Sequence, residues 1–305
     1  PPSSRLRALV VDDSAYNRQT IASMLAADPT VEVVGRAVNG KEALQLAFDL
    51  RPDVITLDLE MPEMDGFAFL RLLMARQPTP VIVVSSHADR EHVFRALELG
   101  AIDFIAKPTR QIGPELRRIE DDLREKMRVV RRLAAVRVRE RARMIAELAG
   151  PGEAGSELGA EASVGLLASG AALSSLKPAI EVDEEPLGVV GIAASTGGPP
   201  AIQRLFSALP ATLPLAFVVA QHMPARFTRA FAGRLDKISL FRVVEAQDGD
   251  RLRRGAVYIA PGAFNVELER GAAGVCVRVR DPAARTGAPA LTPSGDLLFA
   301  SGGAA

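Results

Sequence analysis

The first residues that could do chemistry are three carboxylates, each just after a short apolar run. Asp12 and Asp13 follow Leu9-Val10-Val11, and Asp58 follows Val54-Ile55-Thr56-Leu57. If these runs are parallel strands of one sheet, the carboxylates meet at one edge and repel one another unless a cation lies between them. Oxygen-rich sites of this kind suit Mg²⁺. The structural alternative is that each Asp caps the helix that follows it.

Two further polar residues follow the next predicted strands. Ser85 ends the run Val81-Ile82-Val83-Val84, and Lys107 lies just beyond Ile102-Asp103-Phe104-Ile105. Helix capping does not explain five polar groups at the ends of four strands. A carboxylate beside a divalent cation and an ammonium group can attack a phosphoryl group and become an acyl phosphate. The sequence therefore predicts a phosphoacceptor site.

A serine in the second half of the chain lies between a predicted strand and a predicted helix. Ser195 follows the apolar residues 189–193 and precedes a helical pattern over residues 199–209. A serine at such a turn is exposed above the sheet, where helix N–H groups can stabilise an oxyanion. The turn resembles a nucleophile elbow, although Ala193 stands where G-x-S-x-G has its first glycine. The structural alternative is that Ser195 only caps the helix.

One histidine is placed to act as the base for this serine. The chain has three histidines, His87, His92 and His222, and only His222 lies in the second half. It closely follows the predicted strand 215–220, so in a parallel sheet it shares the edge that carries Ser195. A serine nucleophile needs a base whose pKa is near neutrality, and histidine fits that need.

These groups are positioned by alternating strand and helix patterns. Between residues 6 and 108, apolar β-branched runs alternate with segments whose apolar residues recur at i, i+3 and i+4, as in helices with one buried face. The same alternation resumes at residue 187, with further strand-like pieces at 242–245, 256–259, 266–268 and 275–279. The predicted fold class is α/β, with two doubly wound parallel-sheet domains. The first is flavodoxin-like and the second Rossmann-like.

Between the two patterns lies a segment of different composition. We expect a first domain at 1–112, a helical and flexible linker at 113–186 and a second domain at 187–305. The helical pattern over residues 114–148 carries a dense arginine series, which we interpret as a solvated helix face. Residues 150–186 are rich in Gly, Ala, Ser and Glu, a composition typical of flexible linkers.

Composition excludes several classes of protein. The 305 residues carry 37 Lys+Arg and 37 Asp+Glu, with 5% aromatic residues and no Trp, which argues against nucleic acid as a partner. No basic helix-turn-helix of a DNA-binding regulator is visible after the linker. No apolar run approaches the ~18 residues of a membrane span, and no secretory signal is present. The single Cys276 suits a reducing compartment, so we expect a cytoplasmic protein.

Residues 6–108 resemble the receiver domain of two-component response regulators. Four motifs carry the resemblance: Val10-Val11-Asp12-Asp13-Ser14, Leu57-Asp58-Leu59-Glu60-Met61-Pro62-Glu63-Met64-Asp65-Gly66, Val84-Ser85-Ser86 and Phe104-Ile105-Ala106-Lys107-Pro108. The resemblance implies that Asp58 is the phosphoacceptor and that Mg²⁺ is held by Asp12, Asp13, Asp58 and the carbonyl of Glu60. It also implies that Ser85 hydrogen-bonds the phosphoryl group, that Lys107 pairs with it, and that Phe104 is the switch aromatic.

Taken together, the receiver motifs, the linker and the second half resemble chemotaxis protein-glutamate methylesterase response regulators. The second half contributes Ile192-Ala193-Ala194-Ser195-Thr196-Gly197-Gly198-Pro199, Ala220-Gln221-His222-Met223-Pro224 and Gly255-Ala256-Val257-Tyr258-Ile259-Ala260-Pro261-Gly262. The resemblance implies a cytoplasmic hydrolase, with no cofactor for the ester chemistry, that removes methyl esters from glutamates of chemoreceptors and deamidates some glutamines.

The same resemblance assigns roles and partners. It implies that Ser195 attacks the ester carbonyl, that His222 moves the proton, and that the backbone N–H of Thr196 is an oxyanion donor. Methyl-accepting chemoreceptors would be the substrates, and the chemotaxis histidine kinase would be the phosphodonor. The unphosphorylated receiver would cover the ester site, and phosphorylation of Asp58 would uncover it.

The sequence departs from the family pattern near its end. The family's triad aspartate lies in a Thr-Gly-Met-Gly-x-Asp-Gly motif that this sequence does not contain, and Asn265 stands where the family often has a histidine. We therefore expect a second domain that is incomplete at its C-terminus. Asp248, Asp250 and Asp296 are conceivable substitutes, but their spacing supports none of them. The alternative function is a phosphoacceptor and docking protein whose esterase domain is weak or inactive.

Overall fold

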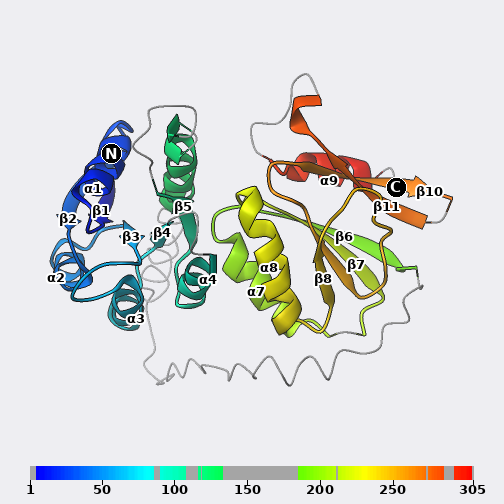
Figure 1. Ribbon diagram of the computed structural model, residues 1–305, viewed down its shortest axis with the longest axis horizontal. Coiled ribbons are helices and arrows are strands. Elements are labelled where there is room, and N and C mark those ends of the chain that lie inside the picture. The colour runs from blue at the N-terminus through cyan, green and yellow to red at the C-terminus, as the bar shows by residue number, and fades with distance from the viewer. Residues whose placement is uncertain are drawn as a thin grey trace, which may run out of the picture. The chain divides into compact units, whose positions relative to one another are not determined.

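The computed structural model describes residues 5–85, 90–107, 116–117, 119–132, 185–210, 212–272, 274–284 and 292–303. The chain forms two compact units, Pro1–Leu167 and Ala168–Ala305, and each contains a parallel sheet with helices packed on it (Figure 1). In the described part of the chain, no helix is both long enough and apolar enough to cross a membrane.

The first unit is a five-stranded parallel sheet with the strand order β2-β1-β3-β4-β5. This order is that of flavodoxin-like doubly wound folds, and it confirms the predicted class. The strands are β1 (Leu6–Val11), β2 (Val31–Ala37), β3 (Val54–Asp58), β4 (Val81–Ser85) and β5 (Asp103–Ala106). The labelled helices between them are α1 (Ala15–Ala26), α2 (Gly40–Leu50), α3 (Gly66–Arg76) and α4 (Arg90–Glu98).

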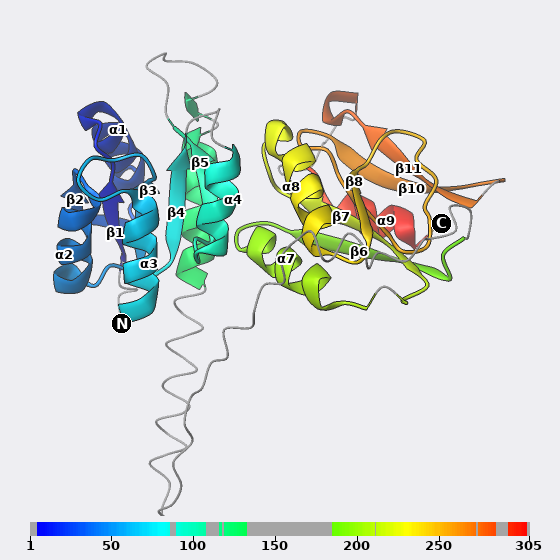
Figure 2. The same ribbon diagram turned by 60° about the horizontal axis from the view of Figure 1, so that its bottom comes forward.

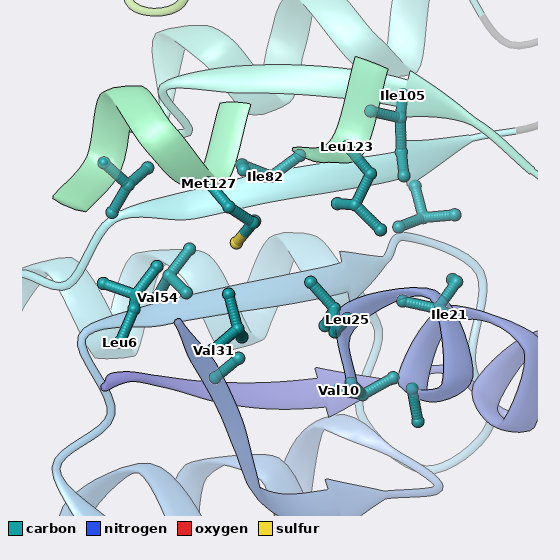
Figure 3. Close-up of a cluster of buried hydrophobic side chains, with 14 of the residues drawn as sticks. Leu6, Val10, Ile21, Leu25, Val31, Val54, Ile82, Ile105, Leu123 and Met127 are labelled. Atoms are coloured by element: carbon teal, nitrogen blue, oxygen red, sulfur yellow. The ribbon is translucent and has the colours of Figure 1, made fainter. Parts of the chain in front are cut away.

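A helix over residues 119–132 completes one face of this sheet and corrects our expectation of a linker from residue 113. Its buried side chains are Ile119, Leu123, Met127 and Val130, and they join the core cluster formed by α1 and the strands. Figure 3 shows Leu123 and Met127 beside Ile82 and above Leu25. The arginines lie on the other faces of this helix. Because they are so numerous, the sequence pattern indicated a solvated helix and not one with a buried apolar face.

A buried ion pair fastens the same helix to β5. Lys126 is only 6% exposed, and its Nζ lies 2.7 Å from Asp103 Oδ2 and 3.2 Å from Asp122 Oδ1. Asp103 in turn accepts a hydrogen bond from the backbone N–H of Phe104 through Oδ1, at 2.8 Å. Burial lowers the pKa of Lys126, but the two carboxylates outweigh burial and leave that pKa above its ordinary value.

The second unit contains a four-stranded parallel sheet with the order β6-β7-β9-β8. Its strands are β6 (Gly188–Ala194), β7 (Leu215–Gln221), β8 (Arg242–Glu245) and β9 (Ala256–Ile259). Helices α7 (Gly198–Ala208) and α8 (Ala225–Ile238) connect and cover the strands (Figure 2). The expected strands at 242–245 and 256–259 are confirmed at these bounds.

The two faces of this sheet are packed by different kinds of side chain. On the helix face, Phe217 meets Phe206 and Phe241 edge-on, with ring centroids 5.3 Å apart in each pair. On the other face, small residues such as Ala216 and Ala220 allow a close approach by a hairpin and a short helix. The hairpin is β10 (Asn265–Gly271) with β11 (Gly274–Arg280), and a short turn of helix, η1 (Pro282–Ala284), follows it. The helix is α9 (Gly295–Gly302).

The antiparallel hairpin and α9 were not predicted. The strand pieces at 266–268 and 275–279 were expected, but they form a separate two-stranded sheet instead of extending the parallel one. The two strands are paired in register up to Gly271 and Gly274, and Gly274 has a φ of +106°.

We predict that Lys126→Met lowers the free energy of unfolding of the first unit by roughly 3–5 kcal/mol, because it leaves the Asp103 carboxylate buried without its counter-charge. Native-state hydrogen exchange of β5 and of the helix over residues 119–132 measures this loss. The control is Arg128→Met, which removes an ion pair with Glu125 whose arginine is 59% exposed, and which should cost less than about 1 kcal/mol. Equal effects of the two substitutions would contradict the prediction.

Candidate functional site

The first site lies at the carboxyl ends of the parallel strands of the first unit. Asp12, Asp13 and Asp58 each present a carboxylate oxygen, and these three atoms all lie within 4.8 Å of one another. Asp12 and Asp58 are buried, whereas Asp13 is exposed. This convergence was predicted from the sequence, and the strand order brings it about by pairing β1 directly with β3.

Helix capping does not account for these carboxylates. The N-cap of α1 is Ser14, whose hydroxyl accepts the backbone N–H of Asn17, and the N-cap of α3 is Asp65. Asp12 Oδ1 instead accepts the backbone N–H of Ser14 at 2.9 Å. The capping alternative is therefore wrong for Asp12, Asp13 and Asp58.

Lys107 supplies the positive charge of this site. Its Nζ donates to Asp58 Oδ2 at 2.7 Å, and the backbone N–H of Glu60 donates to Asp58 Oδ1 at 3.2 Å. Burial raises the pKa of Asp58, although the ion pair with Lys107 opposes that shift. Burial lowers the pKa of Lys107, but its contact with Asp58 outweighs burial and raises that pKa overall. The ion pair therefore favours the charged form of both groups, against the effect of burial.

The carboxylate of Asp12 is buried close to the negative charge of Asp58. Burial and, to a smaller extent, repulsion by Asp58 raise its pKa from 3.8 to about 6. Its Oδ2 is buried and has no hydrogen-bond partner among the residues that the structure describes. A hard divalent cation would satisfy this oxygen and relieve the repulsion, so the donor set fits Mg²⁺.

The other residues predicted for this site lie in or just after the strands β3, β4 and β5. Ser85 ends β4, where it is buried, and its carbonyl accepts the backbone N–H of Lys107 at 2.8 Å. Phe104 is buried in β5, next to Asp103. The exposed side chain of Glu60 lies beside α4, with Oε1 4.0 Å from His92 Nδ1.

The second site lies at the carboxyl ends of β6 and β7. Ala194 and Gln221 are the last paired residues of these neighbouring strands, and Ser195 and His222 follow them directly. The backbone N–H of His222 donates to the carbonyl of Ala194 at 3.0 Å, which continues the pairing by one more bond. Ser195 and His222 are both half-buried. The structure thus brings the predicted nucleophile and base to adjacent positions on one edge.

The turn after Ser195 determines which groups can act as oxyanion donors. The N-cap of α7 is Gly197, with a φ of +79°, and no side chain within the described residues caps this helix, so Ser195 does not serve as the cap. Pro199 and Pro200 occupy the first turn and have no backbone N–H. The backbone N–H of Gly198, the first residue of α7, donates to the Ser195 carbonyl at 2.8 Å. The first turn therefore does not supply the donors that we expected from the helix, and the backbone N–H groups of Thr196 and Gly197 are the candidates for this role.

Sequence reasoning missed the residue that connects the two loops. The side-chain Nε2 of Gln221 donates to the carbonyls of Ser195 at 3.1 Å and of His222 at 2.9 Å. The available signal was its position immediately before His222, at the last residue of a buried strand.

None of the three aspartates considered as substitutes gains support. Asp248 Oδ1 accepts the backbone N–H of Val279, and Asp250 Oδ2 accepts that of Gln247, so both hold loops together. Asp296 is exposed in the first turn of α9. Asn265 is buried, and its Oδ1 accepts the backbone N–H of Ser294 at 2.8 Å, which anchors the start of α9.

We predict that the stability of the cation-free protein falls as the pH rises from about 4 to about 6. The folded state binds a proton at Asp12 more tightly than the unfolded state does, and this contribution is lost as the pH rises through the folded pKa of about 6. Thermal unfolding measured with and without Mg²⁺ should show stabilisation by Mg²⁺ at about pH 7.5 and little at about pH 5.

Asp12→Asn should raise the melting temperature of the cation-free protein at neutral pH and remove most of the Mg²⁺ effect. The control is Asp49→Asn, at an exposed position in α2, which should change neither. An undiminished Mg²⁺ effect in Asp12→Asn would contradict the assignment.

Two family models match the chain. The response regulator receiver domain matches residues 8–113, and the CheB methylesterase matches residues 190–305. Among solved structures, the receiver domain of CheB from Thermotoga maritima is 42% identical, with a TM-score of 0.39, and covers 42% of this chain and 97% of its own. The catalytic domain of CheB from the same organism is 33% identical, with a TM-score of 0.37, and covers 40% of this chain and 62% of its own.

Curated relatives match along most of the chain. A protein-glutamate methylesterase/protein-glutamine glutaminase of Geobacter sulfurreducens is 47% identical over 91% of this chain and 73% of its own length. One from Myxococcus xanthus is 45% identical over 87% of this chain and 68% of its own. With a receiver match before residue 114 and a methylesterase match after residue 189, the chain belongs to the protein-glutamate methylesterase/protein-glutamine glutaminase family.

Proposed function

We propose that this chain is a phosphorylation-activated hydrolase that cleaves methyl esters of glutamate side chains on chemoreceptors and deamidates glutamines. The observation that carries the proposal is that Ser195 and His222 follow the last paired residues of β6 and β7. The relatives are named for both hydrolytic activities, which favours hydrolysis over the docking-only alternative.

In the first half of the reaction, the Ser195 hydroxyl attacks the ester carbonyl while His222 accepts its proton. The backbone N–H of Thr196 donates to the oxyanion that develops on the carbonyl oxygen. The tetrahedral intermediate then collapses, the C–O bond to the methoxy group breaks, and His222 gives the proton to the departing oxygen. Methanol leaves, and the glutamyl group remains on Ser195 as an ester.

Water completes the reaction by the same route. His222 takes a proton from water, the hydroxyl attacks the acyl-enzyme, and the proton returns to the Ser195 oxygen as it leaves. The product is a glutamate carboxylic acid. Glutamine would react in the same way, with ammonia as the leaving group in place of methanol.

The first unit accepts the phosphoryl group that controls this chemistry. An Asp58 oxygen attacks the phosphorus of a phosphohistidine on a histidine kinase, and the N–P bond breaks as the O–P bond forms. Asp12, Asp13, Asp58 and the carbonyl of Glu60 would hold Mg²⁺, which neutralises charge on the transferred group. Lys107 and Ser85 would contact the phosphoryl oxygens, and Phe104 would respond to the change at Ser85.

We place the end of the phosphoacceptor domain after residue 132, because the helix over residues 119–132 packs in its core. The hydrolase domain would begin at residue 187. Chemoreceptors as substrates, a chemotaxis histidine kinase as phosphodonor and a cytoplasmic location stay predictions.

We predict that Ser195→Ala reduces methanol release from a methylated chemoreceptor by at least about 10³-fold, because the nucleophile is lost. His222→Gln should reduce it to a comparable extent, since the two side chains act as a unit. Ser207→Ala, at an exposed position on α7, is the matched control and should leave the rate unchanged. Methanol release by Ser195→Ala at more than a tenth of the wild-type rate would refute the proposal.

A further inference from the structure

Gln221 is the one buried polar side chain in the described part of the second unit that touches the backbone of both Ser195 and His222. It is 0% exposed and is the last residue of β7. Its amide group has two N–H bonds, and Nε2 directs one to the Ser195 carbonyl at 3.1 Å and one to the His222 carbonyl at 2.9 Å. Both N–H groups of the amide are therefore used in hydrogen bonds to these two residues.

The anchor of this side chain is rigid. The backbone of Gln221 is paired with that of Ala194 in the parallel ladder between β6 and β7. Ser195 and His222 lie one residue beyond the ladder, where strand pairing no longer constrains them apart from the bond from the His222 N–H to the Ala194 carbonyl. The Gln221 amide therefore continues the constraint of the sheet into both loops.

Gly198 leaves the space that this amide occupies. A Cβ on Gly198 would overlap with Gln221 Oε1 and lie 2.8 Å from the Cβ of Ala194. Gly198 is the first residue of α7 and is not among the glycines with positive φ, so space and not backbone conformation requires a glycine here. The start of α7, the Ser195 turn and the Gln221 amide thus fit together as one packed unit.

The amide oxygen of Gln221 is a buried acceptor. Gln221 Oε1 is buried and has no hydrogen-bond partner among the residues that the structure describes. Most buried polar atoms in folded proteins are paired, so an unpaired one calls for an explanation. An apolar side chain of similar size would fill this place without the unpaired oxygen. What it could not supply is the pair of N–H bonds to the two loops.

We propose that Gln221 is a positioning residue for ester hydrolysis, whose amide sets the separation of the Ser195 and His222 main chains and thereby of nucleophile and base. This inference rests on the proposed function. The hydrogen bonds that Gln221 donates reach the main-chain carbonyls of Ser195 and His222, so it acts through the backbone. Proton transfer needs the two groups within hydrogen-bond distance, and a displacement of about 1 Å can cost about 10²-fold in rate.

The first test is Gln221→Met, which keeps the length of the side chain, adds no charge and removes both donors. We expect kcat for methanol release from methylated chemoreceptor to fall about 10- to 100-fold, with KM changed less than about twofold. The matched control is Gln247→Met, at an exposed glutamine between β8 and β9, which should leave kcat unchanged. Thermal unfolding of each variant shows whether the folded fraction accounts for any loss.

The second test uses Gly198→Ala, which leaves Gln221 itself unchanged. In the wild-type background the new methyl group displaces the amide, so kcat should fall. In the Gln221→Ala background the obstructing oxygen is gone, so Gly198→Ala should cost at least about fivefold less than it does in the wild type. This double-mutant cycle also tests the positioning role of Gln221 if Gln221→Met fails to fold.

Each outcome has a distinct meaning. Absence of methanol release from the wild-type chain contradicts the proposed function, and this inference with it. An active wild type combined with an unchanged kcat in Gln221→Met overturns the positioning role alone. Strictly independent effects of Gly198→Ala and Gln221→Ala also overturn it, because they show that the two residues do not share one constraint.

Discussion

The parallel pairing of neighbouring strands is the constraint on which both sites depend. Parallel strands end at the same edge of a sheet. Residues that are far apart in sequence are therefore brought together there by the pairing of the strands, and not by an attraction between their side chains. In the first unit this places Asp58 of β3 beside Asp12, which follows β1. In the second unit it places Ser195 and His222 one step beyond a paired position. Antiparallel pairing would send the same residues to opposite ends of the sheet.

The two sites lie at the same place in their sheets but are held together by different kinds of interaction. The first concentrates charge in a buried place, where burial raises the pKa of both Asp12 and Asp58, and the charge of Asp58 raises the pKa of Asp12 further. Lys107 opposes both shifts only in part. Such a site responds strongly to a cation or to a phosphoryl group. The second is held by uncharged hydrogen bonds from Gln221 and by close packing at Gly198. It therefore depends on geometry, which would suit the proposed proton transfer between Ser195 and His222.

Much of this arrangement follows from the sequence, because apolar runs and the polar residues after them are local signals. The strands of both sheets, the carboxylate cluster and the Ser195–His222 pair were predictable on that basis. The helix over residues 119–132 was not assigned to the core, although Ile119, Leu123 and Met127 recur at helical spacing, because its arginines dominate the pattern. The ion pair between Lys126 and Asp103 joins residues through the fold and leaves no local signal. The only local signal for the hydrogen bonds of Gln221 was its position directly before His222, which does not show which carbonyls the amide reaches.

The central claim is that one chain couples phosphoryl transfer at Asp58 to ester hydrolysis at Ser195. The most direct measurement is the rate of methanol release from methylated chemoreceptor in the presence of Mg²⁺, before and after addition of acetyl phosphate. We predict that the wild-type rate rises at least about fivefold, in the range of typical allosteric couplings, and that the Asp58→Asn rate does not change. A wild-type rate that is insensitive to acetyl phosphate, or equal stimulation of Asp58→Asn, would contradict the account.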